Sequence, residues 1–119
     1  MKISILEDNK VYLKKLKSFL EDRWHKVITY NTIEKFEFIE SDIYLVDLQI
    51  GKEMSFDLIK DIRYNTNSMI IIISHHTKPS ILRKGIEYGA DYYFNKMNID
   101  QYSLQFEIIE NLSKRLWKL

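Results

Sequence analysis

Apolar residues gather in five short runs along the chain, and stretches with helical periodicity lie between them. The five runs cover residues 2–6, 26–30, 43–46, 69–73 and 92–94, and each has the length and composition of a β-strand. The third and fourth runs are continuously apolar, as expected for strands that are buried on both faces of a sheet.

The intervening segments predict five helices. In residues 10–23 apolar side chains recur every three or four positions, with lysines on the opposite side. Asn31 followed by Glu34 resembles a capping box and predicts a short helix that holds Phe36, Phe38 and Ile39. Further helices are expected over residues 55–64, from Pro79 to a cap at Gly89, and over residues 100–119.

Strands that alternate with helices across short loops are typical of parallel strands joined by right-handed crossovers. The fold class expected is therefore α/β, a doubly wound five-stranded parallel sheet with five helices. No internal repeat or linker interrupts residues 1–119, so a single domain is predicted.

Composition narrows the range of functions. The chain of 119 residues has no cysteine, which excludes disulfides and thiolate chemistry, and its net charge of +1 is a poor match to a nucleic-acid-binding surface. The first strand starts at Lys2, which leaves no room for a signal peptide, and no apolar run is long enough to cross a bilayer. A cytoplasmic location is expected, with no direct binding to nucleic acid or membrane.

Polar residues follow the ends of four predicted strands. Glu7 and Asp8 follow the first strand, Asp47 the third and Ser74 the fourth, and Lys96 comes just after the fifth. In an open parallel sheet these positions meet at one edge, where ligands bind. Three carboxylates raise each other's pKa unless a cation compensates them, and Mg²⁺ prefers carboxylate, carbonyl and water ligands. A Mg²⁺ site is expected at this edge.

These segments together resemble the receiver domain of bacterial two-component response regulators, a flavodoxin-like fold of the CheY-like superfamily. The resemblance rests on ILEDN, YLVDLQI, IIIIS and GADYYFNK and covers essentially the whole chain. It implies that Asp47 accepts a phosphoryl group from a histidine kinase. It also implies a Mg²⁺ site made by Glu7, Asp8, Asp47 and the backbone carbonyl of Gln49, in which Asp8 binds the ion directly and Glu7 helps through a bound water. Lys96 would pair with the phosphoryl oxygens, while Ser74 and Tyr93 would move as the switch.

The chain departs from the family pattern at four positions. Met97 replaces the proline that usually follows the lysine, so a trans peptide is predicted there. His75 replaces a very small residue beside the phosphoacceptor and is expected to restrict the approach of a donor. His76 occupies a position that in the family influences the lifetime of the acyl phosphate, and Gly51 replaces a loop proline. Metal binding by either histidine is the less favoured interpretation.

The resemblance implies an output surface formed by the fourth helix, fifth strand and fifth helix. This region carries Tyr88, Tyr92, Tyr93, Phe94 and Tyr102, and the last helix has a wide apolar stripe that includes Trp117. Either a partner interface or a broad cover for the sheet accounts for the stripe; the interface predicts partial exposure of Trp117 or Tyr102. The partner expected at this surface is a downstream protein, an attached output domain or a second copy of the chain in a homodimer.

Two other functions remain open. A pseudo-receiver would bind proteins without phosphoryl chemistry, as His75 and Met97 allow. A small phosphatase would use Asp47 as its nucleophile, but such enzymes usually have an acid two residues later, where this chain has Gln49. The expectation is a regulatory domain, not an enzyme, with self-phosphorylation and self-dephosphorylation at most.

Overall fold

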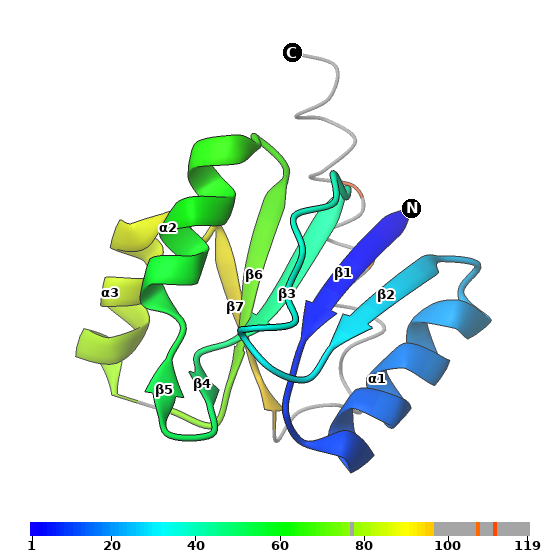
Figure 1. Ribbon diagram of the computed structural model, residues 1–119, viewed down its shortest axis with the longest axis horizontal. Coiled ribbons are helices and arrows are strands. Elements are labelled where there is room, and N and C mark those ends of the chain that lie inside the picture. Colours follow the sequence, from blue (N-terminus) through cyan, green and yellow to red (C-terminus); the bar gives the residue numbers. More distant parts are fainter. Residues whose placement is uncertain (77, 97–106, 108–110, 112–119) are drawn as a thin grey trace.

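A computed structural model describes residues 1–76, 78–96, 107 and 111. Its main sheet contains five parallel strands in the spatial order β2-β1-β3-β6-β7 (Figure 1). In chain order these strands are β1 (Lys2–Leu6), β2 (Lys26–Tyr30), β3 (Ile43–Asp47), β6 (Met69–Ser74) and β7 (Tyr92–Asn95). The strand order reverses between β1 and β3, so the doubly wound parallel sheet expected from the sequence is confirmed.

Three helices are described: α1 (Lys10–Asp22), α2 (Phe56–Asn65) and α3 (Pro79–Tyr88). The Asn9 side chain accepts a hydrogen bond from the Tyr12 amide and caps α1, Pro79 opens α3, and Gly89 ends α3 with a φ of 131°. The expected helix bounds for these three are correct to within a residue or two. Of the last predicted helix only residues 107 and 111 are described, and both are helical. The Lys96–Met97 peptide, Tyr102 and Trp117 lie outside the described residues.

Alternate residues of each strand face opposite layers, which creates two cores. Ile3, Ile5 and Leu45 face α1 and pack with its Leu16 and Leu20. Their neighbours on the opposite side of the sheet pack with α2 and α3; these are Leu6, Tyr44, Val46, Ile70 and Ile72. Figure 1 shows α1 on one side of the sheet and α2 with α3 on the other. Because both faces are covered, the central strands β3 and β6 are buried at every position.

The short helix predicted after Asn31 does not form, and that prediction is wrong. The segment between β2 and β3 makes a single turn, in which the Thr32 hydroxyl rather than Asn31 accepts from the Lys35 amide at 3.1 Å. Tertiary contacts then outweigh helix formation: Phe38 stacks on buried Tyr44 at 5.9 Å, and the Tyr44 hydroxyl donates to the Ile39 carbonyl at 2.8 Å. Tyr44 thus holds the chain in an extended path.

A two-stranded antiparallel hairpin, β4 (Gln49–Ile50) and β5 (Glu53–Met54), follows β3 and was not expected from the sequence. Gly51 lies at its turn with a φ of 61°, a left-handed conformation that glycine adopts without strain. The hairpin projects beyond the carboxyl end of the sheet (Figure 1), beside the predicted site.

At the opposite end of the sheet, Arg63 of α2 joins several segments. Its guanidinium donates to the carbonyls of Gly89, Thr66 and Ser68 and pairs with Asp91. Asp91 also accepts from the Ile70 amide at 2.9 Å. This planar, multidentate arrangement suits arginine and locks the end of α3 and the start of β7 to α2. Among the described helices, none has both the length and the apolar character needed to span a membrane.

Candidate functional site

The side chains predicted to meet at one sheet edge do meet there. One carboxylate oxygen each from Glu7, Asp8 and Asp47 lies within 4.8 Å of the others, although Asp47 is some forty positions away in the chain. Glu7 and Asp8 follow β1 directly, and Asp47 is the last residue of the adjacent β3. Parallel pairing of these two neighbouring strands therefore creates the acidic cluster.

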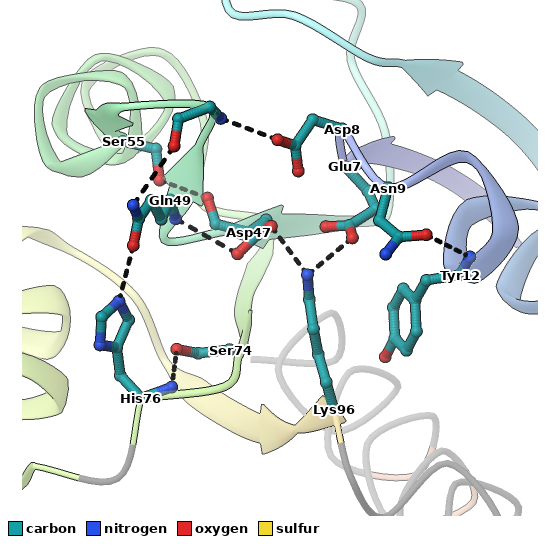
Figure 2. Close-up of polar contacts among 11 residues, drawn as sticks. Glu7, Asp8, Asn9, Tyr12, Asp47, Gln49, Ser55, Ser74, His76 and Lys96 are labelled. Carbon is teal, nitrogen blue, oxygen red and sulfur yellow. Dashed lines mark hydrogen bonds and ion pairs between the residues drawn. The ribbon is translucent and has the colours of Figure 1, made fainter.

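Lys96 brings the compensating charge from beyond β7. Its Nζ donates to Asp47 Oδ2 at 2.8 Å and to Glu7 Oε1 at 2.6 Å, and all three side chains are nearly inaccessible to solvent (Figure 2). The ammonium also lies 5.0 Å from the centre of the Tyr12 ring, a cation–π contact that positions the lysine from α1. Burial alone would lower the pKa of Lys96, but its hydrogen bonds with Asp47 and Glu7 outweigh burial and raise that pKa.

The pKa of Glu7 is strongly raised. Burial raises its pKa to about 8, and the closeness of Asp47 adds to the shift while Lys96 opposes it. Glu7 is fully buried, and its Oε2 atom has no hydrogen-bond partner. One ammonium thus faces three carboxyl groups, which leaves the cluster with excess negative charge when all three are ionised.

An open hollow of about 360 Å³ lies over Asp47, and eight residues line it: Asp8, Asn9, Asp47, Gln49, Gly51, His75, His76 and Lys96. Exposed Asp8 forms one side, where its Oδ2 accepts from the Gly51 amide at 2.8 Å. The Gln49 amide donates to Asp47 Oδ1 at 3.2 Å, so Lys96 and Gln49 each hold one oxygen of Asp47. The Ser55 hydroxyl donates to the Asp47 carbonyl at 2.5 Å and fixes its backbone.

Ser74 and the two histidines form the side of the hollow next to β6. Ser74 is buried, and its Oγ accepts from the His76 amide at 2.9 Å. His75 is exposed and lines the hollow, while His76 is half-buried and its Nε2 lies 3.2 Å from Gln49 Oε1. Among the described residues, neither histidine belongs to a cluster suited to a metal ion. Tyr93 is 46% exposed on β7 and is not among the residues that line the hollow.

The donor set suits a hard divalent cation. Three carboxylate oxygens stand close enough to share one ion, and the buried Oε2 of Glu7 lacks any protein donor. A cation such as Mg²⁺ would satisfy these oxygens and offset their repulsion. With oxygen ligands only and no thiolate, this cluster does not resemble a site for a soft transition metal.

The acids, Ser74 and Lys96 were predictable from the sequence, but several supporting contacts were not. Neither Tyr12 nor Ser55 was expected to take part in the site. The pairing of Lys96 with Glu7 and the bond between His76 and Gln49 had no local signal either. Each of these contacts depends on how separate loops approach one another.

Known proteins resemble this chain in sequence and in fold. The family model of the response regulator receiver domain matches residues 3–107. The transcriptional regulatory protein KdpE of Staphylococcus aureus is 27% identical over 118 residues, which cover 95% of this chain and 51% of KdpE. The chain therefore spans about half the length of that relative.

Solved structures share the fold. A two-component response regulator from Clostridium difficile superposes with a TM-score of 0.84 at 22% identity, covering 98% of both chains. A response regulator from Burkholderia pseudomallei, solved with a phosphorylated aspartic acid, a calcium ion and citrate, has a TM-score of 0.71 at 20% identity, covering 80% of this chain and 59% of its own. With its parallel sheet, its acidic edge and its match to the family model, the chain belongs to the response regulator receiver domain family.

Proposed function

We propose that this domain is a phosphoryl-accepting switch in which Asp47 is the phosphoacceptor. The observation that carries the proposal is the position of Asp47 beneath an open hollow, with its carboxylate held by Lys96 and the Gln49 amide and with Glu7 and Asp8 beside it. The family supports a receiver role, and the Burkholderia relative contains a phosphorylated aspartic acid.

The chemistry is a displacement at phosphorus. A carboxylate oxygen of Asp47 attacks the phosphorus of a phosphohistidine or of acetyl phosphate. The bond to the imidazole nitrogen or acetate oxygen breaks, and its electron pair leaves with that group. Lys96 Nζ neutralises charge on the transferred oxygens, and the Gln49 amide orients the Asp47 carboxylate. The product is an acyl phosphate on Asp47.

Glu7, Asp8, Asp47 and the Gln49 carbonyl would hold Mg²⁺, which supplies electrostatic stabilisation of the developing charge. Before transfer, Lys96 bridges Glu7 and Asp47. Lys96 would leave this bridge for the phosphoryl oxygens once the charge of the carboxylates is compensated in another way.

We further propose that Ser74 and Tyr93 report the modification. The Ser74 hydroxyl accepts from the His76 amide, so its proton remains available to a phosphoryl oxygen. A shift of Ser74 toward the hollow would open space behind it for the exposed ring of Tyr93. New contacts in one state favour that state by population shift.

The partners belong to the same proposal. A histidine kinase would donate the phosphoryl group, and the signal would leave through α3 and β7, where Ile86, Tyr92 and Tyr93 are exposed. A downstream protein, an attached output domain or a second copy of the chain would receive it there. The curated relative is longer, which supports an attached output domain. We place residues 1–119 in one receiver domain that acts in the cytoplasm.

Mass measurement after treatment with acetyl phosphate and Mg²⁺ tests the proposal. We expect the wild-type protein to gain one phosphoryl group and Asp47→Asn to gain none. Asp57→Asn, which alters an exposed aspartate at the start of α2, is the matched control and should behave as the wild type. A wild-type protein that stays unmodified, and whose amide resonances near Asp47 do not respond to beryllofluoride, would instead be a pseudo-receiver.

A further inference from the structure

A continuous series of hydrogen bonds crosses the rim of the hollow, from the loop after β6 to the loop after β1. His76 Nε2 meets Gln49 Oε1 at 3.2 Å, Gln49 Nε2 donates to the Gly51 carbonyl at 3.2 Å, and the Gly51 amide donates to Asp8 Oδ2 at 2.8 Å (Figure 2). We call residues 76, 49, 51 and 8, linked in this way, the rim chain.

Gln49 is held both at its backbone and at its side chain. The backbone amide of Gln49 donates to Asp47 Oδ1. In the side-chain amide group, Oε1 contacts His76 Nε2 and Nε2 donates to the Gly51 carbonyl. With these three contacts, an exposed residue at the start of a two-residue strand has little freedom to rotate. His76 thus contacts the side chain of the residue whose carbonyl is a proposed cation ligand, although the His76 ring has no hydrogen bond to a carboxylate of the cluster among the described contacts.

We infer that His76 is a positioning residue for the cation site, acting through the side chain of Gln49. The inference rests on the proposed function, because it takes the Gln49 carbonyl and Asp8 as cation ligands. By holding Gln49, His76 orders the 49–51 loop before the ion arrives, and this reduces the entropy lost on binding. The Gly51 amide meanwhile holds one Asp8 oxygen and so fixes the orientation of that carboxylate.

The alternative is that the contact between His76 and Gln49 is a surface hydrogen bond with no effect on the site. The two possibilities predict different results in a double-mutant cycle. Substituting the His76 side chain leaves its backbone bond to Ser74 intact, and Gln49→Ala retains the backbone carbonyl. Both variants thus disturb the rim chain without removing a proposed cation ligand.

The experiment is a titration of metal-free protein with MgCl₂, followed by the amide resonances of Gly51 and Asp8. We expect His76→Ala to weaken Mg²⁺ binding by about fivefold, the effect of losing one neutral hydrogen bond. His76→Gln, which retains a donor and an acceptor of similar reach, should bind within about twofold of the wild type if its amide replaces the imidazole. In a Gln49→Ala background, His76→Ala should have no further effect.

The inference would be overturned if His76→Ala and the wild type bound Mg²⁺ with equal affinity. It would also be overturned if His76→Ala weakened Mg²⁺ binding as much in the Gln49→Ala background as in the wild type. Phosphorylation of Asp47 is measured separately by mass, so the proposed function survives either result. If the wild-type protein binds no Mg²⁺ but is phosphorylated, only the cation proposal and this inference fail. If the wild-type protein neither binds Mg²⁺ nor becomes phosphorylated, the proposed function fails together with the cation proposal and this inference.

Discussion

Lys96 Nζ lies 2.6 Å from Glu7 Oε1, and this contact joins the loop after β7 to the residue that follows β1, 89 positions earlier. The pair is buried and shares its ammonium with Asp47. A buried carboxyl with one unpaired oxygen is costly unless it is protonated or bound to a cation. The stability of this edge of the sheet therefore depends on whether the Glu7 carboxyl holds a proton, pairs with the Lys96 ammonium or binds a metal ion.

Loss of the Lys96 ammonium should destabilise the metal-free protein. Lys96→Met leaves Glu7 and Asp47 side by side without their cation, and breaking a buried pair in this way costs about 3 kcal/mol. We expect urea denaturation in EDTA to show this loss, and added Mg²⁺ to restore part of it by binding only the folded state. Lys60→Met, at an exposed position on α2, should change stability little. Equal stabilities for Lys96→Met and Lys60→Met would contradict the assigned ion pair.

The pH dependence of stability should carry the signature of Glu7. Burial raises the pKa of Glu7 from 4.5 to about 8 in the folded protein, so the folded state holds a proton that the unfolded chain releases. The stability associated with this proton is fully present below pH 4.5 and is lost as the pH rises toward about 8. Metal-free wild-type protein should therefore lose stability across this window relative to Glu7→Gln, whose amide does not titrate. The free energy of unfolding of both proteins is measured by urea denaturation at several pH values. If it changes with pH in the same way for both, the pKa of Glu7 is not raised in the folded protein.

Gly89 should tolerate alanine less well than Gly51 does. Both residues have positive φ, but a Cβ at Gly89 would lie 2.7 Å from Arg63 Cβ, whereas a Cβ at Gly51 would meet nothing within 4 Å. Gly51→Ala should cost about 1 kcal/mol from backbone strain alone. Gly89→Ala should cost about 1–3 kcal/mol more, because overpacking would displace the Arg63 guanidinium from its carbonyl partners. Thermal or urea unfolding of the two variants provides the comparison, and a smaller loss for Gly89→Ala would contradict the packing described here.

Much of this molecule was predictable because the determining signals are local. Periodicity and glycine or proline punctuation identified the five strands of the main sheet and the three described helices, and alternation alone predicted a parallel sheet. Since parallel strands bring their carboxyl ends to one edge, the sequence also predicted that Glu7, Asp8, Asp47 and Lys96 would gather there, as they do.

Tertiary structure decided the features that depend on contacts between distant segments. The helix expected after Asn31 is absent because buried Tyr44 binds the Ile39 carbonyl and stacks with Phe38, a stronger determinant than a capping pattern. The raised pKa of Glu7 and the link between His76 and Gln49 likewise arise only once separate loops are packed together. Local patterns specify which elements form and which ends they share, whereas burial and side-chain partners are properties of the assembled fold.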